Sequence, residues 1–340
     1  MSANKHNITC VFEDGATSRF TSSSFETVYQ AALRSGLSLE TDCREGACGV
    51  CKAFLSDGDC DLGDFSDEAL TGEEEEQGYI LSCQARAKGD IVLEFGYPLS
   101  LVNKEMACIE GRVAALEPVA DNVMRLVLES DAEPLAFLAG QYVNLSVEGR
   151  VQARSYSFAN SPLQGGAMEF FVRLLDRGAM TDWLRDGARV GDAINIEGPY
   201  GQFFLRTPRG GELLMVAGGT GLAPILSMLE TLKASDAPPP AVRVLYGANH
   251  PGELFGLERL AAYGDWVSVD TAVVAGDSGW RGNVGFVTDL IANQKLADVS
   301  LADAYLCGPP AMIDAARKAL GERGLRAERI FAEKFLPSEK

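Results

Sequence analysis

The sequence predicts a multidomain α+β protein, because its hydrophobic pattern changes character twice along the 340 residues. Short alternating strands and one helix precede Pro98, a run of strands follows Cys108, and strands alternating with helices begin at Glu212. A chain of this length is long enough for two or three separate cores. We therefore expect domains at residues 1–98, 108–208 and 209–340, with a linker at 99–107.

The composition indicates a water-soluble protein that does not bind nucleic acid or anionic membranes. Mean hydropathy is zero, no apolar run has membrane-spanning length, and the first residues lack a signal-peptide apolar segment. The net charge is −18, and residues 1–98 carry 18 acidic side chains against 7 basic ones, a balance of −11. Such a surface repels nucleic acid and anionic membranes. We expect a monomeric cytoplasmic protein without nucleic-acid or membrane partners, whose acidic surface either docks on a basic protein or serves solubility alone.

The first domain is predicted to be a mixed sheet crossed by one helix. Asp14-Gly15 has the composition of a hairpin turn, and Gly36 follows the predicted helix as a stop signal. The acidic run at 73–76 is expected to lie in water. The predicted elements are strands at 7–12, 17–21, 52–56 and 90–95 and a helix at 27–35.

Cysteines in this domain have the spacing of an iron–sulfur ligand set. Three follow C-x4-C-x2-C in one loop and a fourth comes after a gap of 31 residues, which is the plant-type [2Fe–2S] pattern. Gly46 and Gly49 allow the loop to wrap closely and to aim backbone N–H groups at sulfur. The alternatives are a zinc site or four unrelated thiols, but zinc motifs usually contain two separated C-x2-C pairs. The candidate metal ligands are Cys43, Cys48, Cys51 and Cys83, and the cysteines expected to be free thiols are Cys10, Cys60, Cys108 and Cys307.

The second domain is predicted to be a small antiparallel barrel. Residues 97–106 lack periodicity, which indicates a linker, and short strands then follow one another between turn signals. A Gly-Pro-Tyr-Gly turn at 198–201 ends this pattern. The expected strands are 111–116, 122–129, 141–147, 154–158, 168–174 and 192–197, with a short helix at 181–185.

The tetrapeptide Arg154-Ser155-Tyr156-Ser157 predicts a flavin site on one of these strands. Arg154 and Tyr156 share a face, so a cation for a pyrophosphate lies beside a ring for the flavin, and Ser157 can hydrogen-bond near the nitrogen that receives a hydride. Alone, the tetrapeptide fits any exposed strand. A second signal follows at 178–181, where the start of a short helix offers backbone N–H groups and a threonine hydroxyl to phosphate. Together the two signals favour a flavin site.

At Glu212 the pattern changes to strand, glycine turn and helix. Gly-Gly-Thr-Gly at 218–221 follows an apolar strand and precedes a helix whose first turn holds Pro224. This βαβ pattern predicts a parallel sheet and a turn suited to a dinucleotide pyrophosphate, although the turn differs from G-x-G-x-x-G and is weak evidence by itself. The expected elements are strands at 213–217, 242–246, 267–273 and 304–306 and helices at 222–232, 253–263, 287–292 and 311–320.

A second loop at a strand end complements the glycine turn. It reads Cys307-Gly308-Pro309-Pro310, and Gly308 lets a ligand approach the backbone. Cys307 either faces a nicotinamide ring or is an ordinary buried cysteine at the end of a strand.

These motifs, in this order, resemble those of the reductase components of bacterial multicomponent oxygenases. In that family a plant-type ferredoxin domain precedes a flavin- and nucleotide-binding ferredoxin-reductase module. The resemblance covers essentially the whole chain. It implies a β-grasp [2Fe–2S] ferredoxin domain, an antiparallel β-barrel FAD domain and an α/β parallel-sheet NAD-binding domain. It also implies an electron path from NADH to FAD, to the cluster and to a terminal oxygenase (hydroxylase) component.

The resemblance also implies the residues of each site. It places Phe335 over the flavin ring and Glu333 near the nicotinamide, so that Ser157, Cys307 and Glu333 are the residues expected at the reacting atoms. The chain continues for five residues beyond Phe335, whereas plant relatives end at their aromatic residue. FAD is expected at Arg154, Ser155, Tyr156, Ser157, Gly178, Met180, Thr181 and Phe335, and NADH at Gly218, Gly219, Thr220, Gly221, Cys307, Gly308 and Pro309.

The sequence motifs do not decide between two subgroups of the family. Asp-Cys-Arg-Glu-Gly around Cys43 and Leu-Ser-Cys-Gln around Cys83 resemble the reductases of benzoate-type ring-hydroxylating dioxygenases. The segments 219–224, 307–314 and 333–338 resemble instead the reductases of soluble di-iron monooxygenases that act on methane, other hydrocarbons or phenol.

The expected chemistry belongs to the cofactors. NADH gives up two electrons as a hydride, an oxygenase iron centre accepts one at a time, and a flavin converts between the two, so no general base is expected. One alternative is an electron carrier or redox adaptor without nucleotide oxidation, against which the intact glycine turn argues. Another is a self-sufficient oxygenase, but His6 and His250 are the only histidines and supply no 2-His-1-carboxylate site.

Overall fold

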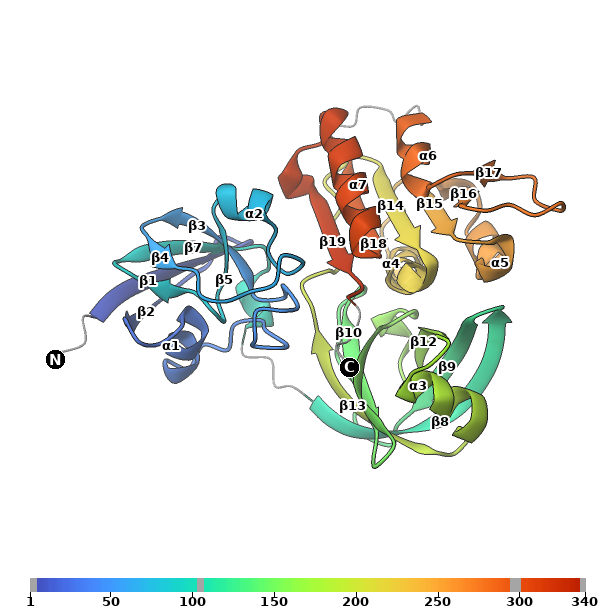
Figure 1. The fold of residues 1–340 in the computed structure, drawn as a ribbon, viewed down its shortest axis with the longest axis horizontal. Helices are drawn as coiled ribbons and strands as arrows, with labels where there is room; N and C mark the ends of the chain where they lie inside the picture. The colour runs from blue at the N-terminus through green and yellow to red at the C-terminus, as the bar shows by residue number, and fades with distance from the viewer. Residues whose placement is uncertain (1–4, 103–106, 294–300, 337–340) are drawn as a thin grey trace. The chain divides into compact units, whose positions relative to one another are not determined.

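The structure is a computed structural model that describes residues 5–102, 107–293 and 301–336. It contains two compact units, one formed by Met1–Met106 with Tyr200–Gln202 and the other by Ala107–Pro199 and Phe203–Lys340. The larger unit therefore holds both the predicted barrel and the predicted parallel sheet (Figure 1). No helix in the described part of the chain is long and apolar enough to cross a membrane.

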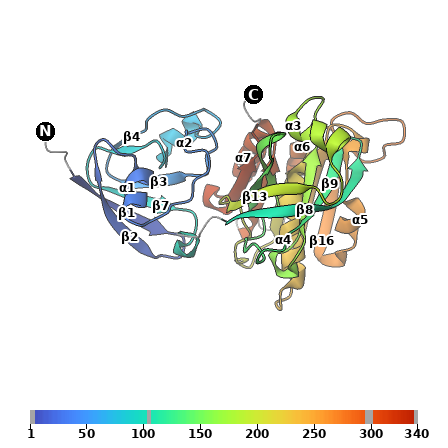
Figure 2. The same ribbon diagram turned by 90° about the horizontal axis from the view of Figure 1, so that it is seen from below.

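The first unit has the mixed sheet that the sequence predicts. Its strand order is β2-β1-β7-β3-β5, in which β1 pairs antiparallel with β2 and parallel with β7. Helix α1 lies across this sheet (Figures 1 and 2) and starts at a capping box in which Thr27 and Gln30 bond each other's backbone N–H groups. The elements are β1 Lys5–Phe12, β2 Thr17–Ser23, α1 Val28–Arg34, β3 Lys52–Asp57, β4 Cys60–Asp61, α2 Gly72–Glu76, β5 Tyr79–Leu81, β6 Arg86–Ala87 and β7 Ile91–Phe95.

The acidic run at 73–76 lies outside the core as predicted, because no residue of α2 is buried. Glu74 also closes the capping box of Thr71 and binds the Lys52 ammonium at 2.7 Å. The linker expected at 97–106 does not begin at Tyr97, whose fully buried ring packs against those of Phe12 and Phe95. Residues 99–101 form the short helix η1 with a buried Leu101, while 103–106 lie outside the described residues.

The barrel in the second unit is a six-stranded sheet of order β11-β10-β13-β8-β9-β12. Strands β11 and β12, at the two ends of this order, also contact each other, so the sheet curls until its two edges meet. The short helix begins two residues before its predicted start and continues as one π-helical turn, η3. The elements are β8 Ala107–Ala120, β9 Val123–Glu129, β10 Tyr142–Val147, β11 Val151–Ser157, β12 Met168–Arg173, α3 Ala179–Asp182, η3 Trp183–Gly187 and β13 Ala193–Tyr200.

The parallel sheet has the order β17-β16-β15-β14-β18-β19. Helix α4 packs on one face in a core with Met215 and Tyr246, and α6 and α7 pack on the other face with Leu214 and Leu306. The elements are β14 Leu213–Gly218, α4 Leu222–Ala234, β15 Val242–Ala248, α5 Leu257–Ala261, β16 Val267–Val273, β17 Asn283–Val284, α6 Val287–Asn293, β18 Asp303–Gly308, α7 Pro310–Glu322 and β19 Ile330–Lys334.

The sequence did not predict the edge strands β17 and β19. The helix expected at 253–263 is also shorter than predicted, because Gly256 has a left-handed φ of 70° and α5 begins only after it.

Candidate functional site

The candidate cluster ligands converge as two pairs of thiols. The Cys43 and Cys48 side chains hydrogen-bond each other, and so do those of Cys51 and Cys83. No group of three or more histidine, cysteine, aspartate or glutamate side chains in the described ranges is arranged to hold one metal ion. A [2Fe–2S] cluster uses four cysteines on two irons, so two pairs of thiols fit its donor set.

Glycines allow the ligand loop to pack against the backbone beside it. Gly46 and Gly49 have φ of 76° and 74°, a region that disfavours side chains. A Cβ on Gly46 would lie 2.5 Å from the Asp64 carbonyl oxygen, and one on Gly49 would lie 2.9 Å from that of Ala69. Positions 46 and 49 therefore require glycine for reasons of both conformation and space.

Hydrogen bonds to sulfur favour the charged thiolate at Cys43. The Cys48 side chain lowers the pKa of Cys43 to about 5, and the backbone N–H groups of Glu45 and Ala47 act in the same direction. Both nitrogens lie 3.4 Å from the Cys43 sulfur. Donors aimed at sulfur in this way also stabilise a cluster-bound thiolate.

Gln84 is a further donor that the sequence analysis missed. Its side-chain nitrogen Nε2 lies 3.8 Å from the Cys83 sulfur and 3.2 Å from the carbonyl oxygen of Arg44. Its position directly after the fourth ligand is the signal that could have identified it.

The remaining cysteines agree with the prediction of free thiols, since none forms a disulfide in the described structure. Burial raises the pKa of Cys10 to about 12 and that of Cys60 to about 11, so both stay neutral near pH 7.

The candidate flavin residues alternate along β11 as predicted. Arg154 and Tyr156 are half-buried on one face, and Ser155 donates to the Asn144 side chain at 2.7 Å. Burial raises the pKa of Tyr156, which keeps the phenol neutral. Ser157, at the end of the strand, is only 7% exposed. This arrangement leaves Arg154 and Tyr156 as the pair best placed to meet an anionic, planar ligand.

The turn at 178–181 lies beside this strand, because α3 contacts β11. Gly178 is the N-cap of α3, and the Thr181 hydroxyl accepts the Leu175 N–H at 3.1 Å, which leaves its proton to donate. Met180 is 4% exposed and packs in the barrel core, so its side chain is directed away from solvent. The backbone of this turn, with Thr181, is what the structure offers to phosphate.

The glycine turn and the Cys-Gly-Pro-Pro loop form one continuous site. They end β14 and β18, which are adjacent parallel strands. A Cβ on Gly221 would lie 2.1 Å from the Cys307 carbonyl oxygen, and one on Gly308 would lie 2.8 Å from the Met312 Cε and 3.2 Å from the Gly218 Cα. Gly219 has φ of 55° and faces open space. Ligands of α/β proteins bind at this carboxyl edge of the sheet.

The C-terminal strand joins the same edge. Glu333 pairs with Cys307 in the register of β18 and β19, and the Phe335 N–H donates to the Gly308 carbonyl at 2.9 Å. Cys307 is fully buried in the core beneath α4, and burial raises its pKa well above the usual value. The thiol is therefore buried in this structure, and the Cys307 carbonyl borders the glycine turn.

Comparison with known proteins matches each region to a family. Residues 11–88 match the 2Fe-2S iron-sulfur cluster binding domain, 111–205 the oxidoreductase FAD-binding domain and 215–318 the oxidoreductase NAD-binding domain. The toluate 1,2-dioxygenase electron transfer component of Pseudomonas putida is 36% identical over 98% of this chain and 99% of its own. The chain belongs to the family of oxygenase electron-transfer components.

This reductase is therefore an NADH-dependent oxidoreductase with FAD and a [2Fe–2S] cluster, through which electrons pass in that order. The phenol 2-monooxygenase reductase component DmpP of Pseudomonas sp. strain CF600 is also 36% identical, over 91% of this chain and 89% of its own. Among solved structures, the Amycolatopsis cytochrome P450 reductase GcoB is 32% identical, with a TM-score of 0.72 over 97% of this chain and 99% of that one. The predicted fold class, cofactors and reaction agree with these findings.

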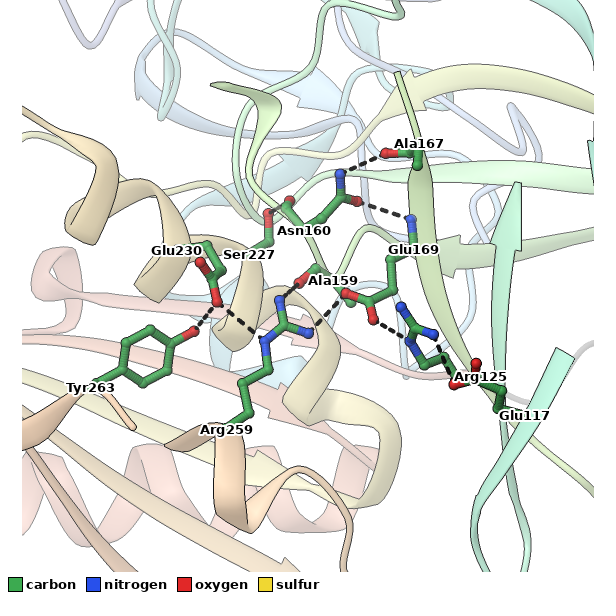
Figure 3. A network of polar contacts seen from close by, with 10 residues as sticks. All are labelled: Glu117, Arg125, Ala159, Asn160, Ala167, Glu169, Ser227, Glu230, Arg259 and Tyr263. Atoms are coloured by element: carbon green, nitrogen blue, oxygen red, sulfur yellow. Dashed lines mark hydrogen bonds and ion pairs between the residues drawn. The ribbon is translucent and has the colours of Figure 1, made fainter. Parts of the chain in front are cut away.

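The reductase also contains polar residues that the sequence analysis missed, at the contact between its barrel and its parallel sheet (Figure 3). Glu169 and Arg259 are the centre of this network. Neither residue belongs to a motif, so no pattern in the sequence signalled it.

Proposed function

We propose that this reductase supplies electrons to the terminal oxygenase of a benzoate-type ring-hydroxylating dioxygenase. One observation carries the proposal, the end-to-end similarity to such components. The electron transfer components of toluate 1,2-dioxygenase and of 2-halobenzoate 1,2-dioxygenase match 98% of this chain and 98% or more of their own length. The motifs around Cys43 and Cys83 support the same subgroup. The protein acts as a monomer in the cytoplasm.

In this proposal each group of candidate residues has one task. The four cysteines ligate the two irons, Arg154 pairs with the FAD pyrophosphate, and Tyr156 lies against the isoalloxazine ring. The glycine turn at 218–221 and Gly308 hold the nucleotide, and Phe335 covers the flavin. Bound FAD accepts a hydride and releases single electrons, while the protein orients it and excludes water.

Reconstitution with purified oxygenases tests the acceptor. The reductase, loaded with FAD and cluster, is combined with NADH and either a benzoate-type dioxygenase or a soluble di-iron phenol hydroxylase. We expect product formation coupled to NADH consumption with the dioxygenase and slow, uncoupled NADH consumption with the hydroxylase. The reverse pattern would overturn the proposal in favour of the monooxygenase subgroup.

That second candidate rests on a separate observation. The segments 219–224, 307–314 and 333–338 resemble monooxygenase reductases, and the propane 2-monooxygenase reductase component of Gordonia sp. strain TY-5 is 33% identical over 91% of this chain. The same reconstitution decides between the two.

A further inference from the structure

A buried carboxylate bridges the barrel and the parallel-sheet domain (Figure 3). Glu169, on β12, is 8% exposed. One of its oxygens accepts the Arg125 Nε–H from β9 at 2.6 Å, and the other accepts an Arg259 Nη1–H from α5 at 2.8 Å. The first contact lies within the barrel and the second crosses to the parallel-sheet domain.

Arg259 extends this bridge to two more elements. Its Nε–H donates to Glu230 on α4 at 3.2 Å, and its Nη2–H donates to the Ala159 carbonyl just after β11 at 3.0 Å. Tyr263 donates its hydroxyl proton to the same Glu230 oxygen at 2.7 Å. One planar guanidinium thus fixes α4, α5 and the exit of β11 to one another, as only a forked donor can.

Helix α4 makes direct contacts of its own with the same barrel segment. The Ser227 hydroxyl donates to the Asn160 carbonyl at 2.7 Å, and the Thr231 hydroxyl lies 3.0 Å from that of Ser161. The Asn160 side chain in turn accepts the Glu169 N–H at 2.9 Å. The contact is therefore a connected polar network rather than one ion pair.

This network joins the two halves of the electron-transfer site. Ala159 and Asn160 directly follow β11, which ends at Ser157, so they continue the strand proposed to hold the flavin. Helix α4 starts directly after Gly221 and is therefore continuous with the glycine turn proposed to hold the nucleotide. The position of α4 against residues 159–161 consequently sets the distance between the two proposed cofactor sites.

We propose that Glu169 and Arg259 are positioning residues for hydride transfer, which hold the nicotinamide site in register with the flavin site. Hydride transfer needs donor and acceptor atoms in near-attack geometry, and a shift of about 1 Å can cost about a hundredfold in rate. A carboxylate held between two guanidiniums provides the direction and stiffness that apolar packing lacks. The inference depends on NADH-to-FAD transfer alone and not on the identity of the oxygenase.

Rapid mixing of the full-length, cofactor-loaded protein with NADH under anaerobic conditions tests the proposal. For Glu169→Gln and for Arg259→Gln we expect the limiting rate of flavin bleaching to fall about 10- to 100-fold. The dissociation constant for NADH, the FAD content and the flavin midpoint potential should stay near the wild-type values. The double variant should be no slower than the slower single variant, because both changes disrupt one network.

Two further variants separate positioning from folding. Arg243→Gln removes a comparable ion pair, to Glu212 at 3.4 Å, inside the parallel-sheet domain, and it should leave the limiting rate unchanged. Arg259→Lys keeps the charge but loses the fork and should give an intermediate rate.

Ser227→Ala tests the proposal if the Glu169 variant does not fold. It removes only the hydrogen bond from α4 to the Asn160 carbonyl, between the parallel-sheet domain and the barrel, and it should slow flavin bleaching severalfold. Variants that lower the melting temperature but retain the wild-type bleaching rate would overturn the proposal. So would variants that change only the affinity for NADH.

Discussion

The cluster loop and the contact between barrel and parallel sheet solve two different problems. The loop gathers four thiols that iron requires, and three of them come from one short stretch beginning at Cys43. The contact aligns two sites, and its residues come from separate elements, from Arg125 on β9 to Tyr263 after α5. The metal ligands are therefore recognisable as a compact sequence motif. The residues proposed to align the two cofactor sites are charged residues scattered along the sequence.

The difference has a physical origin. A plant-type [2Fe–2S] cluster takes four cysteine thiolates, three of them from one loop, so both the residue type and the spacing of its ligands are constrained. A bridge between two surfaces only needs opposite charges at the places where the surfaces meet, and those places are set by tertiary packing.

The largest effect is expected for Cys48→Ser, which removes a cluster ligand and sharpens the contrast between the two regions. Electron delivery to a one-electron protein acceptor should be abolished, because the cluster is the exit from the flavin. NADH-driven reduction of a small dye should remain largely intact. Steady-state assays with both acceptors measure this. Loss of the dye activity in a folded, flavin-loaded variant would show that the two regions do not work as separate modules.

The next largest effect is expected for Gly221→Ala. Its Cβ would lie 2.1 Å from the Cys307 carbonyl oxygen, which is backbone and cannot rotate away. Overpacking of this kind costs about 1–3 kcal/mol, so the turn should shift and kcat/KM for NADH should fall at least about tenfold. FAD and cluster contents should be retained. Gly321→Ala, where no atom lies within 4 Å, is the control and should leave NADH oxidation unchanged. Equal activity of both variants would mean that the turn does not hold the nucleotide.

These regions also differ in how far the sequence predicted them. The cysteine loop, β11 and the glycine turn follow local rules of spacing, alternation and turn composition, and the structure has them where expected. β19 was missed, because Ile330–Lys334 has no turn signal and is a strand only by pairing with β18. The ion pair between Glu74 and Lys52 was also not predicted, because the two residues are 22 positions apart in the sequence. Long-range pairing decides what local patterns do not.

A smaller effect is expected when NADH is replaced by NADPH, which tests how well the parallel-sheet domain discriminates between the two nucleotides. We expect NADH to be preferred over NADPH by about tenfold in kcat/KM, because the loop after β15 has no arginine for a 2′-phosphate and contains Glu253. The structure fixes this carboxylate through the Asn249 N–H and the Asn122 side chain, both at 3.0 Å. Glu253→Gln should narrow the preference. Steady-state kinetics with both nucleotides measure it, and equal or better kcat/KM with NADPH would refute the assignment.

The smallest effect is expected at the surface around the cluster loop. Exposed carboxylates of Asp64, Asp67 and Glu68 lie on the stretch that packs over the loop, where Ser66 donates its N–H to the Gly46 carbonyl at 3.0 Å. Transient redox interfaces are small and steered by charge, so the rate of electron delivery to the oxygenase should fall as salt shortens the Debye length below about 10 Å.

Neutralising these three carboxylates together should lower that rate about threefold at low salt and remove most of its salt dependence. Flavin reduction by NADH should not change. The matched control is the combination of Glu129→Gln, Asp131→Asn and Glu133→Gln, which removes the same charge from exposed positions of the second unit. If both triple variants behave alike, net charge alone governs association. If delivery is independent of salt and neither variant alters it, the acidic surface serves solubility and the oxygenase docks through apolar contacts.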